Sequence, residues 1–217
     1  MTRNRLLFIL LSLMCIALLI ADLALGSTDI AIADVWATLT GGEVDEVART
    51  IILKIRLTKA VVAVAAGAAL SASGLAMQTL FRNPLAGPYV LGVSSGASLG
   101  VALFLLGAPL LDVAGGSMMQ SVGLDGAAWI GSALILAMVL AVSRRIKDIM
   151  VILILGMMFS SAVDSVVQIL QYLSNEAALK AFVVWTMGSL GDVTGEQLVV
   201  LLPVVVVGLV LSVAAIK

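Results

Sequence analysis

The chain has 217 residues, of which 62% are hydrophobic and 12% are charged, and its formal net charge is −1. Soluble domains carry about twice that share of charge, roughly 25%, so the composition indicates a protein that crosses the membrane several times. The near-neutral charge argues against a nucleic-acid partner, because no basic stripe is available to neutralise phosphates. Histidine is absent, which removes imidazole metal sites and histidine-based triads, and we expect no catalytic residue, metal or cofactor.

The apolar stretches predict an all-α bundle of about six transmembrane helices, because a bilayer core of about 30 Å needs roughly 20 apolar residues per helix. The stretches are 6–25, 58–80, 89–108, 127–143, 149–173 and 197–216. The first could instead be a secretory signal with Arg3 and Arg5 as its basic start. Its apolar core from Leu6 to Ala21 is longer than usual for a signal, so we favour a retained helix. Cys15 is the only cysteine, which excludes an intrachain disulfide.

The long connection 26–57 contains a second kind of helix. Within Ile30–Leu39, an apolar face is formed by Ile32, Val35, Trp36 and Leu39, with Asp29 and Asp34 elsewhere. This pattern predicts a short amphipathic helix on the membrane surface, with Trp36 in the interfacial aromatic belt and Gly41-Gly42 at its end. A further short helix, about 45–56, leads into the second span. Structural packing alone also explains both segments.

Two cations stand at the outer mouth of the second span, in Arg56-Leu57-Thr58-Lys59. Long basic side chains often snorkel at such positions, which is one interpretation of Arg56 and Lys59. The other is a docking point for acidic residues of an external partner.

Small and polar residues recur along the second span, where Gly67, Ser71, Gly74 and Gln78 share one helical face. Such a face is typical of a close helix–helix contact in lipid, and pathway lining is the alternative, mainly for Gln78. A polar break, 81–88, follows with two prolines. After it, Gly92–Gly96 matches the G-x-S-x-G pattern of hydrolases, but no histidine can activate the serine, so helix packing explains the match.

The fifth span carries Ser160, Asp164, Gln168 and Gln171 at spacings of four, four and three. An ionisable residue inside an apolar helix costs about 2.5–3.5 kcal/mol on insertion scales, so it usually faces a cavity or a partner. We leave two roles open for these side chains: lining a pathway, or hydrogen bonding between buried helices.

Charge placement favours a cytoplasmic N-terminus. With this orientation seven of the twelve basic residues lie inside, and the break 81–88 is cytoplasmic. The outside receives nearly all loop acids and five basic residues: Arg49, Lys54, Arg56, Lys59 and Lys180.

These residues together resemble the FecCD/BtuC-type permeases, the membrane subunits of ABC importers for iron–siderophore, haem and cobalamin. The resemblance rests on the runs Arg56–Lys59, Gly67–Gly74, Gln78, Arg82–Ala86, Pro88, Leu91-Gly92, Gly96-Ala97 and Trp185–Leu190. It implies a dimeric permease of about ten helices per subunit in the bacterial inner membrane, with two cytoplasmic ABC ATPase subunits and an extracytoplasmic substrate-binding protein. At 217 residues the chain would hold the N-terminal six helices, without the C-terminal helices and the segment that touches the ATPase.

The resemblance also implies roles for single residues. Arg56 and Lys59 would dock the binding protein, although Thr58 and Lys59 depart from the family's Arg-Leu-Pro-Arg element, and lysine lacks the bidentate geometry of arginine. The loop Arg82, Asn83, Pro84, Leu85, Ala86 would contribute to a cytoplasmic gate, and the polar residues of the fifth span would border the pathway. We therefore expect import by alternating access, with ATP hydrolysed on a separate subunit. The alternative is a secondary transporter coupled to an ion gradient through Asp164.

Overall fold

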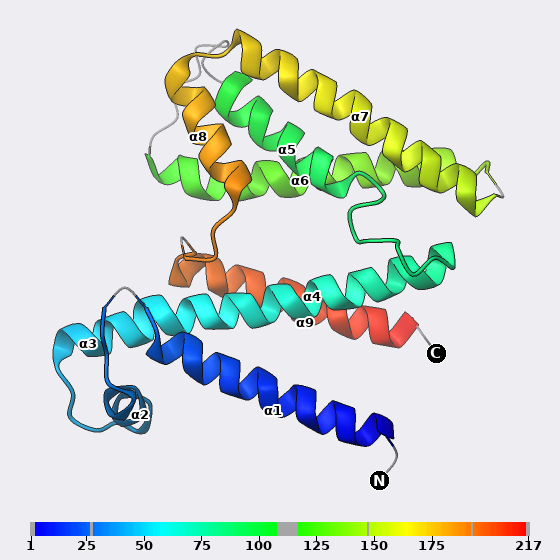
Figure 1. Cartoon of the computed structure of the whole chain (residues 1–217). Helices are drawn as coiled ribbons and strands as arrows, with labels where there is room; N and C mark the ends of the chain where they lie inside the picture. Colours follow the sequence, from blue (N-terminus) through cyan, green and yellow to red (C-terminus); the bar gives the residue numbers. More distant parts are fainter. Residues whose placement is uncertain (1–2, 27, 108–116, 147, 192, 216–217) are drawn as a thin grey trace. The chain divides into compact units, whose positions relative to one another are not determined.

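The computed structural model describes all residues except 1–2, 27, 108–116, 147, 192 and 216–217, and the described part is helical without strands (Figure 1). The chain divides into two compact units. One comprises residues 1–69 and 189–217, and the other comprises residues 70–188. Each unit is described by itself.

The first unit contains the long connection 26–57 and the helices on either side of it. Its helices are α1 (Arg3–Ala24), α2 (Ile32–Thr40), α3 (Glu46–Thr50), the π-helical segment η1 (Ile51–Arg56), the first half of α4 (Leu57–Phe81), and α9 (Gly195–Ala215). The short helix α2 ends at Gly41, whose φ of 82° is the left-handed conformation that favours glycine. Asp45 begins α3, because its carboxylate accepts hydrogen bonds from the amides of Val47 and Ala48. The first short helix predicted in this connection is therefore confirmed. The second, expected at about 45–56, is not separate from the span, because α3, η1 and α4 form one continuous helix from Glu46 to Phe81.

A small apolar core joins α1, α2, η1 and α4 through four buried side chains: Leu23, Val35, Ile52 and Ala60. This core takes up only one of the four residues on the predicted apolar face of α2. Val35 packs inside, whereas Ile32, Trp36 and Leu39 stay exposed. The expectation that Val35 shares one surface with Trp36 is wrong, because the side of α2 that meets α1 takes Val35 and Thr38.

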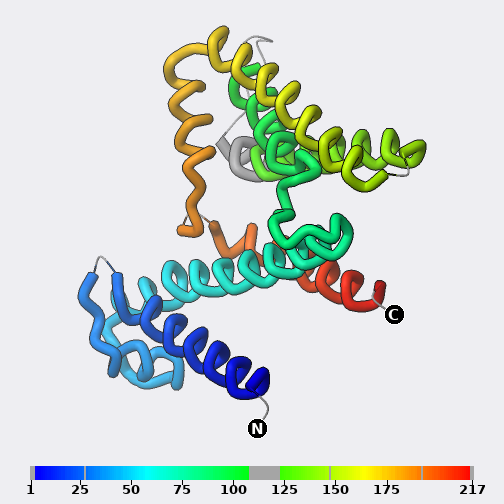
Figure 2. The backbone as a smooth tube through the Cα atoms, turned by 45° about the vertical axis from the view of Figure 1, so that its right-hand side comes forward, coloured from blue at the N-terminus to red at the C-terminus, as the bar shows by residue number. Residues whose placement is uncertain are grey.

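The second unit holds α5 (Val93–Ala102), the π-helical segment η2 (Leu103–Gly107), α6 (Ser117–Ser143), α7 (Ile149–Leu173), α8 (Glu176–Met187) and the second half of α4. Helices α7 and α8 both begin at a side-chain cap. The Asp148 carboxylate accepts from the amide of Met150, and the Asn175 amide oxygen accepts from the amide of Ala178. In Figures 1 and 2, α5 runs between α6 and α7.

The contacts of α5 with α6 and of its N-cap with α7 depend on glycine. A methyl group added at Gly96 would lie 2.6 Å from the Gly131 carbonyl oxygen, and one at Gly92 would lie 2.9 Å from the Ser160 hydroxyl. Only glycine permits such a close backbone approach between helices in lipid. This confirms that helix packing, and not a nucleophile elbow, accounts for the G-x-S-x-G match.

The helices agree with most of the predicted spans. Five of them, within the described residues, are long and apolar enough to cross a membrane: Arg3–Ala24, Glu46–Phe81, Gly123–Ser143, Ile149–Leu173 and Gly195–Ala215. The third predicted stretch, 89–108, is shorter as a helix and covers only Val93–Gly107, because residues before Val93 form turns that end at Gly92 with a φ of 76°. Helix α8 was not predicted, since its 12 residues are too few to span and were assigned to a loop.

Candidate functional site

A polar stripe runs along the exposed face of α7. Of the four residues predicted on this helix, Asp164 and Gln168 are exposed, whereas Ser160 and Gln171 are partly buried. The Ser160 hydroxyl donates to the Gly156 carbonyl at 3.0 Å, on the side of α7 that packs against α5. Ser160 therefore belongs to the packed side of the helix.

Two serines complete the exposed stripe and were missed in the sequence. Ser161 and Ser165 are exposed, and their hydroxyls donate to carbonyl oxygens one turn back along the helix, at 3.1 Å and 2.9 Å. With Asp164 and Gln168 they follow helical spacing, so the four side chains share one face, which we call the α7 stripe. Counting three and four residues outward from Asp164 finds two of the others, Ser161 and Gln168.

A different face of α7 packs against the rest of the second unit, and the stripe lies away from it. Gly156, Val163 and Val167 are buried, and a methyl group at Gly156 would lie 3.2 Å from the Leu91 Cα. This face is therefore held tightly against the second unit's core. Only this narrow face is covered, because other apolar side chains of α7, such as Ile154, Met158 and Ile169, are exposed together with the polar stripe.

The turn after α4 is a tight helix end. Arg82 adopts a left-handed conformation with a φ of 48°, the Asn83 amide donates to the Gln78 carbonyl at 3.1 Å, and the Arg82 amide donates to that of Thr79 at 3.4 Å. These two bonds form a Schellman motif, which satisfies carbonyls that the helix end would leave unpaired. The motif fixes where the chain leaves α4.

The rest of the predicted gate loop is held at its base and exposed at its tip. The Asn83 side chain accepts from the Leu85 amide at 2.9 Å, and the Gln78 side chain donates to the Pro84 carbonyl at 3.1 Å. Ala86 is buried, whereas Leu85 is 90% exposed. Gln78, predicted to line a pathway, binds the loop in this structure.

The cations Arg56 and Lys59, on either side of the start of α4, have different environments. Arg56 is only 6% exposed, and its guanidinium donates to the carbonyls of Leu23, Ala24 and Thr28. The last carbonyls of a helix lack partners within the helix and carry partial negative charge, so a guanidinium there acts as a cap for α1. Gly26 makes room for it, since a methyl group there would lie 2.7 Å from the Arg56 Nη2 atom.

Lys59, one turn later, remains accessible. Its ammonium forms an ion pair with Asp22 at 3.4 Å, and the two side chains are 47% and 38% exposed. The capping role of Arg56 was missed, because Leu23 and Arg56 are 33 residues apart and no local pattern connects them.

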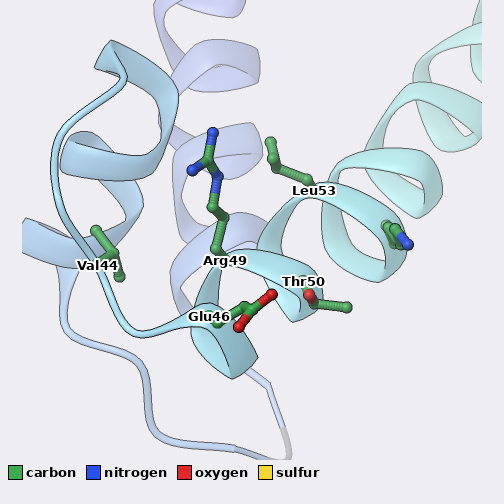
Figure 3. Close-up of a pocket in the computed structure, with 6 residues that line it drawn as sticks. Val44, Glu46, Arg49, Thr50 and Leu53 are labelled. Atoms are coloured by element: carbon green, nitrogen blue, oxygen red, sulfur yellow. The ribbon is translucent and has the colours of Figure 1, made fainter.

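Two more cations border an open depression of about 500 Å³ on α3 and η1, which is lined by Val44, Glu46, Arg49, Thr50, Leu53 and Lys54 (Figure 3). The Arg49 guanidinium points away from the Glu46 carboxylate in this view. Arg49 and Lys54 are both exposed, so the connection 26–57 presents basic groups to its surroundings. Within the described ranges, no group of three or more Cys, Asp or Glu side chains is placed to hold a metal ion.

Comparison with known proteins decides the family. Residues 13–217 match the FecCD transport family. The chain belongs to this family. The FecCD/BtuC-type resemblance predicted from the sequence is confirmed, and the chain is a multi-pass membrane protein.

Several relatives are named as permease proteins of import or transport systems. The chain is 35% identical over 198 residues to the hemin transport system permease protein HmuU of Yersinia pestis, which covers 88% of this chain and 58% of that protein. It is 29% identical over 194 residues to the molybdate import system permease protein MolB of Haemophilus influenzae, covering 87% and 55%. It is 32% identical over 187 residues to the vitamin B12 import system permease protein BtuC of Shigella boydii, covering 86% and 53%.

A solved structure shares the fold. An inward-facing metal-chelate type ABC transporter superposes with a TM-score of 0.72 at 27% identity, over 90% of this chain and 57% of that one. The chain thus spans slightly more than half the length of the relatives it matches.

Proposed function

We propose that the chain forms part of the membrane-spanning permease subunit of an ATP-driven importer for an iron chelate, haem or cobalamin. Membership of the FecCD transport family carries this proposal, and the names of the hemin and vitamin B12 permeases supply the substrate class. The chain itself performs no bond-making chemistry. It contributes walls and moving parts for alternating access, while ATP is hydrolysed on separate subunits.

The α7 stripe is the part of the chain best suited to line the pathway. Asp164 lies near the middle of a 25-residue span, where a charge facing lipid is expensive. Because the chain's own helices leave Asp164 and Gln168 exposed, their partner in the membrane has to be water in a pathway or a second protein surface. In a dimeric permease both are supplied at the interface between subunits.

The turn 82–86 is suited to a gate. Its base is fixed by the Schellman motif and by the bond from Gln78 to Pro84, so movement of α4 would be transmitted directly to the tip. At that tip, Leu85 offers an apolar side chain that can close a narrow passage against water. A cytoplasmic N-terminus would place this turn on the cytoplasmic side, where the ATPase subunits bind.

Docking of an extracytoplasmic binding protein is assigned to the outer cations. Lys59, Arg49 and Lys54 are exposed and can meet acidic groups of a partner. Arg56 contributes by holding the end of α1 in place, which orients the start of α4 and hence Lys59.

Reconstitution of the full-length permease with its ATPase and binding protein tests the function. Uptake of haem, ferric siderophore, cobalamin and molybdate into vesicles is measured. It should require ATP on the side of the membrane where the ATPase subunits bind, and the binding protein on the other side. Uptake driven by a proton gradient without the ATPase would replace the importer with a secondary transporter coupled through Asp164.

Binding-protein affinity tests the docking assignment separately. Charge reversal by Lys59→Glu should weaken docking at low salt, and the loss should shrink as salt is raised, because exposed charges are screened. Asp22→Asn is the matched control, since it frees Lys59 from its ion pair and keeps its charge. Equal affinities of Lys59→Glu and the parent at low salt would remove Lys59 from the docking surface.

A further inference from the structure

Helix α2 carries an apolar stripe that the chain does not cover. Ile32 is 68% exposed, Trp36 is 70% exposed and Leu39 is 47% exposed. Their spacing of four and three residues places them on one side of the helix. Leu25, in the preceding segment, is also 74% exposed and borders an open groove of about 490 Å³ that Ile32 lines as well. The exposed apolar surface therefore continues from α2 to the end of α1.

The core contacts of α2 fix its level along the membrane-spanning helices. Val35 belongs to the same buried cluster as Leu23 in the last turn of α1 and Ala60 in the first turn of α4. Helix α1 has 22 residues, which at 1.5 Å per residue is about 33 Å and matches a bilayer core of about 30 Å. Because α2 packs at the end of this length, it lies at the boundary between the hydrocarbon and the headgroups.

The arrangement of side chains around α2 separates an apolar flank from a polar one. At 100° per residue, the buried Val35 and Thr38 lie between the exposed apolar stripe on one flank and Asp34 on the other. A helix packed sideways against a span has one flank facing along the span toward the hydrocarbon and one facing water. Figure 1 shows α2 nearly end-on while α1 and α4 run across the view, so α2 crosses the direction of the spans.

We propose that α2 lies in the outer bilayer interface, with Ile32, Trp36 and Leu39 inserted among the lipid headgroups and upper acyl chains. The indole of Trp36 suits this zone, because it has an apolar body and one polar N–H group. The ligand is the bilayer itself, and the inserted flank is the Ile32, Trp36, Leu39 side.

This anchor has a consequence for the rest of the outer connection. The chain leaves α2 at Gly41 and enters α3 at Asp45, so α3 and its basic side chains follow α2 directly. Insertion of α2 holds this segment from one side, and the Arg56 cap on α1 holds it from the other. The exposed Arg49 and Lys54 are thereby kept at a fixed height above the bilayer. The proposal concerns membrane contact alone and does not depend on the substrate or on ATP-driven import.

Spin-label accessibility tests the insertion directly. In full-length permease without other cysteines, reconstituted in phosphatidylcholine bilayers, single labels are placed by Ile32→Cys, Trp36→Cys and Leu39→Cys. The matched controls are Asp34→Cys on the opposite flank and Glu43→Cys in the loop that follows. Each label is then exposed to oxygen, which concentrates in lipid, and to a water-soluble nickel chelate.

The expected result is a severalfold higher ratio of oxygen to nickel accessibility at positions 32, 36 and 39 than at 34 and 43. Three labelled positions keep the test valid if one variant fails to fold. Equal ratios at all five positions would show that the stripe faces water and would overturn the proposal. Exclusion of both reagents from the stripe would also overturn it, because a protein surface would then cover α2.

Discussion

The connection 26–57 and helix α7 place charged side chains in opposite environments. In the connection, the Arg56 guanidinium is buried and donates to three carbonyls, so it caps the end of α1. On α7, the Asp164 carboxylate lies in the middle of an apolar span and stays exposed. Arg56 should therefore contribute mainly to stability, and Asp164 should contribute mainly to transport.

The largest effect is expected at Arg56. The change Arg56→Ala leaves the carbonyls of Leu23, Ala24 and Thr28 without their donor, which should lower the free energy of unfolding by about 3 kcal/mol. Thermal unfolding in detergent measures this loss. Lys59→Ala is the control, because its half-exposed ion pair with Asp22 contributes at most about 1 kcal/mol. Equal losses in the two variants would contradict the capping role of Arg56.

The next largest loss of stability is expected at the close contact between α5 and α6. A methyl group at Gly131 would lie 2.9 Å from the Gly100 amide nitrogen and 3.0 Å from its Cα, which are backbone atoms that cannot move aside. Gly131→Ala should therefore destabilise the protein by about 1–3 kcal/mol. Gly67→Ala provides the comparison, since a methyl group there meets nothing within 4 Å and the helix gains about 0.5–1 kcal/mol from alanine. Similar melting temperatures of Gly131→Ala and Gly67→Ala would mean that α5 and α6 can move apart without losing stability.

A smaller and opposite effect is expected at the turn after α4. Arg82 is in the left-handed region, which costs an L-residue about 1–2 kcal/mol and costs glycine little. Arg82→Gly should raise the melting temperature slightly, whereas Arg82→Val should lower it, because a β-branched residue tolerates this conformation poorly. The same order in unfolding free energies would confirm the Schellman motif. A stabilising Arg82→Val would contradict it.

The sequence predicted the helical class, most spans and the short helix α2, because apolar length, helical periodicity and glycine at a helix end are local signals. Gly41 ends α2 as such a signal predicts. It did not predict that Arg56 caps a helix 32 residues earlier, or that Val35 turns inward while Trp36 stays outside. Both depend on where α1, α2 and α4 meet, which no periodicity within one helix determines.

The residues of the candidate site were also predicted only in part. Asp164 and Gln168 were identified because a polar residue in an apolar span is conspicuous, and both lie on the exposed face of α7. Ser160 and Gln171 follow the same spacing, but the contact with α5 draws Ser160 inward. Ser161 and Ser165 were missed because serine also occurs as a packing residue in lipid.

The most direct test of the account compares transport with stability at the α7 stripe. In the full-length permease, reconstituted with its ATPase and binding protein, Asp164→Asn and Gln168→Ala should reduce ATP-driven uptake by about tenfold or more. Their melting temperatures should stay at that of the parent, because both side chains are exposed in this structure. Normal uptake, or a loss of uptake together with a collapse in melting temperature, would contradict the assignment of this stripe to the pathway.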